Sequence, residues 1–214
     1  MKHQNRLRKG DARNGMLTTV QSNLAPQQRL PPEFDSPWAQ QEQVEFFWLL
    51  SEMAGSASIL EIGSCYGNSL RLFALAMRPQ GRVTSIDLGT LPPQSADFCG
   101  TDTSERLKQA ARDIHECGFD VGVFLGDSHH PEVLDYARKR GPYDFIFIDG
   151  DHSYEGVRQD WLDYGPLGKK VGFHDVGNEL YTPGVVKFWH ELRLHCPVKE
   201  KIVSHMGIGL VERS

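Results

Sequence analysis

One segment of the sequence, FIFIDGDHSYEGVRQDW at 145–161, brings two carboxylates and an imidazole together within a few residues. Asp149 and Asp151 flank a glycine at the end of an apolar run, and His152 follows at once. A carboxylate in such a place can hold a divalent cation, and a histidine can take up a proton near neutral pH. The segment therefore indicates a reactive site. The alternative is that His152 and Tyr154 only pack the turn.

A second pair of an imidazole and an acid, His174 and Asp175, ends the next apolar run of the chain. If the two runs are neighbouring strands, this pair lies beside Asp149. Two oxygen donors on neighbouring strands suit Mg²⁺ or Mn²⁺. Asp149, His174 and Asp175 are therefore the candidate metal site, and whether a metal is needed stays open.

The segment ILEIGSCYGNS, at 59–69, predicts a tight turn from a strand into a helix. Its glycines allow the backbone to approach a ligand closely, and its free amides would face that ligand. Cys65 occupies the middle glycine position of the dinucleotide pattern G-x-G-x-x-G, so the turn is less suited to binding a dinucleotide pyrophosphate. A turn of this kind without any ligand is the alternative. The candidate cofactor-binding residues of this turn are Glu61, Gly63, Ser64, Gly67 and Ser69.

Three further polar residues end the second and third apolar runs. Asp87 lies about 20 residues beyond Gly67, the separation at which an acid reaches the ribose hydroxyls of a bound nucleoside. Asp127 and Ser128 could accept a hydrogen bond from the exocyclic amine of adenine. Each also has a structural alternative, because Asp87 could cap a turn and Asp127–Ser128 could cap the helix near Pro131.

Five short apolar runs precede these residues and alternate with helical patterns. The runs are SILEIG (58–63), RVTSID (82–87), DVGVFLGD (120–127), YDFIFIDG (143–150) and KKVGFHD (169–175). Such alternation predicts a mostly parallel sheet. Ligands of open parallel sheets bind outside the carboxyl ends of the strands, so we expect the acids and histidines that end these runs to meet in one crevice.

Helical patterns and two more strands complete the expected fold. Ser36 and Pro37 predict the start of a helix that covers one side of the sheet, and apolar spacing predicts crossover helices around 107–114 and 185–192. VKEKIVSH and GIGLVE, near the end of the sequence, are expected to form a hairpin with a tight connection at His205–Gly207. The segments 88–101 and 176–184 would shape the pocket of a substrate.

Length and composition favour one domain of ordinary size. We expect a polar N-terminal tail or arm over 1–35 and one folded domain over 36–214 of the 214 residues. The net charge of −5 and the pI near 6.0 argue against nucleic acid as a partner. No segment is apolar enough for a membrane span. The cysteines are scattered without the spacing of a zinc site or a disulfide framework, which favours a cytoplasmic protein; they are Cys65, Cys99, Cys117 and Cys196.

From about residue 40 to 212 the sequence resembles the class I S-adenosylmethionine-dependent methyltransferases. It is most similar to the small family related to the macrocin O-methyltransferases and the cephalosporin hydroxylase-like proteins. ILEIGSCYGNS, VTSID, FIDGDHSYEGVRQDW, GFHD and GVVKFW carry the resemblance, and IDGDHSYEGV is its most specific part. The resemblance implies an α/β fold with a doubly wound, mostly parallel, seven-stranded Rossmann-like sheet that ends in an antiparallel hairpin.

The resemblance also implies roles for the residues singled out above. Asp149 and Asp175 match the metal acids of metal-dependent relatives, and His152 matches their general base. His174 stands where those relatives have another acid, which is a departure at the metal site and not at the cofactor site. The implied activity is O-methylation of a small hydroxylated acceptor. The residues implied to bind S-adenosylmethionine are Glu61, Gly63, Ser64, Gly67, Ser69, Asp87, Asp127, Ser128 and Asp149.

Two other classes of function remain alternatives. A nicotinamide-dependent oxidoreductase would use a similar fold and an acid at Asp87, but it would leave the DGDHSY and HD segments without a role. A non-catalytic nucleoside-binding module would keep the fold without the chemistry. The identity of the acceptor and the formation of a homo-oligomer stay open.

Overall fold

A computed structural model describes residues 37–91 and 100–213 of the chain, with side chains from residue 42 onward. The expected N-terminal arm, the helix cap at Ser36, Cys99 and most of the segment 88–101 lie outside the described residues. The helix predicted to begin at Pro37 is present as α2.

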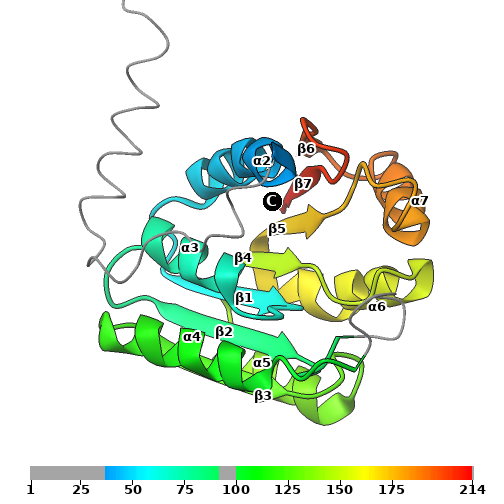
Figure 1. Cartoon of the computed structure of the whole chain (residues 1–214). Coiled ribbons are helices and arrows are strands. Elements are labelled where there is room, and N and C mark those ends of the chain that lie inside the picture. The colour runs from blue at the N-terminus through cyan, green and yellow to red at the C-terminus, as the bar shows by residue number, and fades with distance from the viewer. Residues whose placement is uncertain (1–36, 92–99, 214) are drawn as a thin grey trace, which may run out of the picture. The chain divides into compact units, whose positions relative to one another are not determined.

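Seven strands form one sheet in the order β3-β2-β1-β4-β5-β7-β6 (Figure 1). The first five strands are parallel, and β7 runs antiparallel to both β5 and β6. This confirms the predicted doubly wound, mostly parallel sheet with its closing hairpin. The strands are β1 (Ser58–Ile62), β2 (Arg82–Asp87), β3 (Asp120–Leu125), β4 (Tyr143–Ile148), β5 (Gly168–His174), β6 (Val198–Lys201) and β7 (Ile208–Glu212).

Helices cover both faces of the sheet because the strand order reverses after β3. Right-handed crossovers that step from β1 to β3 and then from β3 to β5 must place their helices on opposite faces. Contacts between the helices agree, since α2 packs on α3 and α3 on α4, while α5 packs on α6 and α6 on α7. The helices are α2 (Pro37–Met53), α3 (Asn68–Ala76), α4 (Ser104–Glu116), α5 (Pro131–Arg140), α6 (Tyr154–Tyr164) and α7 (Pro183–Leu192).

Capping residues and a proline set the first residues of α5, α6 and α7. Ser153 caps α6 by accepting a hydrogen bond from the N–H of Gly156, and α7 begins at Pro183. The residue that caps α5 is His130, and not Asp127 or Ser128. His130 directly precedes Pro131, and its side chain accepts a hydrogen bond from the N–H of Glu132. The alternative role of Asp127–Ser128 as a helix cap is therefore not realised.

The closing hairpin differs from the expected one in its connection. The connection covers residues 202–207, because the buried carboxylate of Glu45 in α2 binds it through the N–H groups of Val203, Ser204 and Gly207. No helix among the residues that the structure describes is long and apolar enough to cross a membrane.

Candidate active site

The turn after β1 contains three residues with a left-handed backbone. Gly63, Cys65 and Gly67 have φ angles of +85°, +48° and +77°. A Cβ atom on Gly63 would lie 2.1 Å from the carbonyl oxygen of Asp149, so only glycine lets the turn pack this closely against the segment after β4. Cys65 breaks the dinucleotide pattern in sequence but adopts a backbone conformation that glycine favours. The predicted cofactor turn and the predicted reactive segment are thus in direct contact.

Glu61, in β1, is completely buried next to this turn. Burial raises the pKa of Glu61 to about 8, against the opposing effect of the Ser69 and Ser64 hydroxyls. Neither carboxylate oxygen has a well-oriented hydrogen-bond partner among the residues described. The Ser64 hydroxyl itself accepts a hydrogen bond of 2.7 Å from Ser85. A buried carboxyl with open oxygens suits a ligand that brings donors or positive charge.

Asp87 connects the end of β2 to the same turn. One of its oxygens accepts a hydrogen bond of 2.7 Å from the N–H of Cys65, and the other accepts one of 2.6 Å from the N–H of Gly89. Burial raises the pKa of Asp87 despite these two bonds. The second of these oxygens, Oδ1, also accepts a long hydrogen bond of 3.5 Å from the Thr103 hydroxyl, whereas Oδ2 keeps a second lone pair with which Asp87 can accept from a ribose hydroxyl.

Asp160 of α6, which the sequence analysis missed, holds the residues after β3. Its Oδ1 accepts a hydrogen bond of 2.8 Å from the Ser128 hydroxyl and lies 3.2 Å from Nε2 of His129. This contact raises the pKa of His129 to about 9. Asp127 instead points outward, with 64% of its side chain exposed. The predicted adenine-side pair is therefore divided between a partly buried network around Ser128 and an exposed carboxylate at Asp127.

Four of the five acids and histidines singled out in the two predicted reactive segments come together at the ends of β4 and β5; the fifth, Asp151, is exposed and accepts a hydrogen bond of 2.8 Å from the N–H of Ser153. Nε2 of His152 lies 3.4 Å from Oδ1 of Asp149, and Nδ1 of His152 lies 3.8 Å from Oδ2 of Asp175. Nδ1 of His174 lies 3.3 Å from Oδ1 of Asp149 and 3.8 Å from Oδ1 of Asp175. The expected convergence of these strand ends is confirmed for β4 and β5.

The charges of Asp149 and the two histidines compensate one another, whereas burial outweighs the histidines at Asp175 and raises its pKa. Burial alone would raise the pKa of Asp149, but His174 and His152 outweigh it and hold that pKa below its ordinary value. Burial opposes protonation of both histidines, yet Asp149 outweighs it and raises their pKa values. The His152 side chain is 44% exposed and that of His174 only 11%. His152 is therefore the imidazole that a substrate can reach.

Two residues that the sequence analysis did not single out support the cluster. Glu42 of α2 places its Oε1 3.3 Å from Nε2 of His174. The side-chain amide of Asn178 donates a hydrogen bond of 3.1 Å to Oδ1 of Asp175. Asp175 itself has a φ of +61°, in the left-handed region that aspartate adopts more readily than most residues other than glycine. The acid that ends β5 is thus held in a fixed position.

The donor set of the cluster fits a divalent cation. Asp149, His152 and Asp175 can each offer one ligand atom, and these atoms lie within 4.8 Å of one another. Bonds of about 2.0–2.2 Å place the donors of one ion at most about 4.4 Å apart, so a small side-chain adjustment would bring them into range. Nδ1 of His174 already lies within 3.8 Å of both acids. The donors are mixed oxygen and nitrogen.

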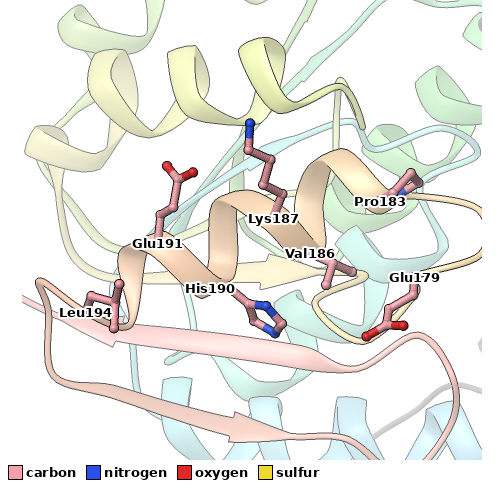
Figure 2. A pocket seen from close by; sticks show the side chains of 7 residues that line it. All are labelled: Glu179, Pro183, Val186, Lys187, His190, Glu191 and Leu194. Atoms are coloured by element: carbon pink, nitrogen blue, oxygen red, sulfur yellow. The ribbon is translucent and has the colours of Figure 1, made fainter.

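A surface groove of about 530 Å³ lies along α7 (Figure 2). None of its lining residues belongs to the cluster or to the turn after β1. Its lining residues are Glu179, Pro183, Val186, Lys187, His190, Glu191 and Leu194. The groove therefore contributes nothing to the candidate active site.

Comparison with known protein families matches residues 60–176, more than half of the chain, to the methyltransferase domain family. One curated relative, named probable caffeoyl-CoA O-methyltransferase 3 of Dictyostelium discoideum, is 27% identical over 174 residues, which are 78% of this chain and 63% of that protein. The caffeoyl-CoA O-methyltransferase of Medicago sativa is 25% identical over 150 residues, covering 68% and 54%. The chain thus spans between half and two thirds of the length of these relatives.

Solved structures share the fold at low sequence identity. The calicheamicin methyltransferase CalS11 superimposes with a TM-score of 0.63 at 17% identity, over 99% of this chain and 94% of that chain. An O-methyltransferase from Bacillus cereus in complex with SAH gives a TM-score of 0.55 at 19% identity, over 98% and 94%. These likenesses extend across the whole sheet.

Proposed function

Because the chain belongs to the methyltransferase domain family, with the class I fold of S-adenosylmethionine-dependent methyltransferases, we propose that it methylates a hydroxyl oxygen of a small-molecule acceptor. One observation carries this proposal: Gly63 packs on the carbonyl of Asp149. That contact sets the cofactor turn beside the cluster of acids and imidazoles. The O-methyltransferase names of the relatives support oxygen as the accepting atom.

The residues around the turn after β1 would bind S-adenosylmethionine. Glu61 offers open, buried acceptors near the positively charged part of the cofactor, and Asp87 would accept from the ribose hydroxyls. Asp127, with its exposed carboxylate, would accept from the adenine amine, while Asp160 holds the Ser128 turn in place. The full proposed set is Glu61, Gly63, Ser64, Gly67, Ser69, Asp87, Asp127, Ser128 and Asp149.

His152 would remove the proton of the acceptor hydroxyl. The bound cofactor supplies a methyl group already activated by a sulfonium, so the protein has to align the acceptor oxygen and take its proton. The ring of His152 is exposed and is oriented by Asp149 at 3.4 Å. General-base help of this kind contributes about 10² to 10⁴-fold to the rate.

A divalent cation, Mg²⁺ or Mn²⁺ among the candidates, would be held by Asp149, His174 and Asp175. Its chemistry would be to lower the pKa of the acceptor hydroxyl.

The cytoplasmic location and a homo-oligomeric state stay predictions. The two alternative functions are less well supported, because neither a nicotinamide oxidoreductase nor a non-catalytic module explains why two acids and two histidines contact one another at the ends of β4 and β5.

Replacing the proposed base tests this function. His152→Ala should lower turnover about 10² to 10⁴-fold in a methyl-transfer assay with a panel of phenol, polyol and sugar acceptors, because the acceptor proton then has no imidazole to receive it. Its affinity for S-adenosylmethionine should stay close to that of the wild type. His190→Ala, which changes an exposed histidine of α7, is the matched control. Turnover of His152→Ala equal to that of the control would exclude His152 as the base.

A further inference from the structure

We propose that His174 is a metal ligand held in place by Glu42, and that the cation site therefore prefers a transition ion such as Co²⁺ or Zn²⁺ to Mg²⁺. This inference depends on the proposed function only for the location of the site, which lies between the cofactor turn and the acceptor. It concerns which atoms bind the ion and which ion they select.

The orientation of the His174 ring is the first observation. The same nitrogen, Nδ1, lies 3.3 Å from Oδ1 of Asp149 and 3.8 Å from Oδ1 of Asp175. His152 differs, because it turns a different nitrogen to each acid. Nδ1 of His174 therefore faces both carboxylates, and small adjustments of the two acids would let all three side chains hold one ion. His152 remains available as the base.

The second observation is the partner of the other ring nitrogen. Nε2 of His174 lies 3.3 Å from Oε1 of Glu42, on a helix that is remote in sequence, which is an ion-pair distance without the alignment of a hydrogen bond. Histidines that bind metals almost always face a carboxylate or a carbonyl with their second nitrogen, which fixes the ring and strengthens the ligand. Glu42 is therefore a positioning residue, acting on the metal through His174.

Packing fixes the ring of His174 in this position. Its centroid lies 5.6 Å from that of Phe46 in α2 and 6.1 Å from that of Phe147 in β4. Only 11% of the side chain is exposed. This packing opposes a rotation of the ring into solvent, so its nitrogen would stay beside a bound cation.

The donor chemistry then decides the choice of ion. Mg²⁺ prefers carboxylate and water oxygens in a regular octahedron, whereas imidazole nitrogen suits Co²⁺, Ni²⁺, Zn²⁺ and Fe²⁺. Replacing one oxygen donor by a fixed imidazole nitrogen weakens the site for Mg²⁺ and strengthens it for these ions. We expect Co²⁺ to bind at least about tenfold more tightly than Mg²⁺.

The structure offers one competing arrangement. In it, a protonated His174 stays between Asp149 and Glu42, and its positive charge takes the place of a cation. The wild type would then bind neither Co²⁺ nor Mg²⁺, and His174→Asp would create a Mg²⁺ site. The two arrangements therefore predict opposite results for the unmodified protein.

Calorimetric titration of the chelator-treated full chain with CoCl₂ and MgCl₂, together with the visible spectrum of the Co²⁺ form, tests the proposal. Glu42→Gln should weaken Co²⁺ binding about 10 to 100-fold, the range found when such supporting carboxylates are lost. Glu52→Gln is the control, since Glu52 lies on the same helix but pairs with Lys199 at 2.9 Å. His174→Asp should change the Co²⁺ spectrum and shift the preference toward Mg²⁺.

Three results would overturn the proposal: no Co²⁺ binding by the wild type, equal affinity for both ions, or Glu42→Gln indistinguishable from Glu52→Gln. If His174→Asp fails to fold, the Glu42 and Glu52 variants still decide the question. Titration of the same samples with S-adenosylmethionine separates this inference from the proposed function. Cofactor binding without the Co²⁺ preference refutes only the role of His174.

Discussion

Replacing Glu61 by glutamine should stabilise the ligand-free protein at high pH. The folded chain raises the pKa of Glu61 from its ordinary 4.5 to about 8, because burial penalises the carboxylate. Below pH 4.5 the group is neutral in both states and costs nothing. As the pH rises from there through 8, the unfolded chain ionises first and the folded state loses stability.

The size of this effect follows from the same shift. At 1.36 kcal/mol for each tenfold change in proton affinity, a rise from 4.5 to about 8 sets an upper limit of about 5 kcal/mol at pH 9. Relaxation and water entry reduce such penalties, so we expect Glu61→Gln to gain about 2 to 4 kcal/mol over the wild type at pH 9 and almost nothing at pH 4.

Urea unfolding of both proteins at pH 4 and pH 9, without cofactor, measures this difference. Glu132→Gln, an exposed change in α5, is the control and should stay within about 0.5 kcal/mol of the wild type at both values. Glu61→Gln should also bind S-adenosylmethionine more weakly than the wild type, because a neutral amide cannot pair with the positive charge of the cofactor. A wild type as stable as Glu61→Gln at pH 9 would refute the reasoning.

Two further predictions concern the turn after β1 and the segment after β3. Gly63→Ala should lower the free energy of unfolding by more than about 2 kcal/mol in urea melts and abolish cofactor binding, because the new Cβ would collide with the Asp149 carbonyl. A variant that is as stable as the wild type and still binds the cofactor would contradict this prediction. Asp160→Asn should destabilise the protein by about 1 to 3 kcal/mol near pH 6. It should do so much less near pH 10, since the pKa of His129 is raised to about 9 and its ion pair is lost as the pH passes that value. An equal loss at both pH values would count against the pair.

The sheet and the reactive cluster could be predicted because their signals are local. Each apolar run ends close to the place where the structure ends the strand, and parallel strands bring their carboxyl ends to one edge. The alternation of strands and helices in the sequence therefore already predicts that Asp149 and Asp175 lie near each other. The backbone conformation of Cys65 was not foreseeable from residue type, because left-handed φ angles are uncommon outside glycine.

The supporting residues escaped prediction because their partners are distant in sequence. Glu42 meets His174, and Glu45 meets residues 203–207, only after α2 has packed on the finished sheet. Asp160 did leave a signal, since Val157, Asp160 and Tyr164 follow the i, i+3, i+7 spacing of a buried helix face. A carboxylate on such a face requires a buried partner, and His129 provides it.

Isothermal titration of the purified chain with S-adenosylmethionine, its demethylated product and NAD tests the central claim most directly. Micromolar binding of the first two with no response to NAD is the result that the geometry around Glu61 and Asp87 predicts. Preference for NAD, or no binding of either nucleoside, would contradict the assignment of the cofactor turn and with it the proposed methyl transfer.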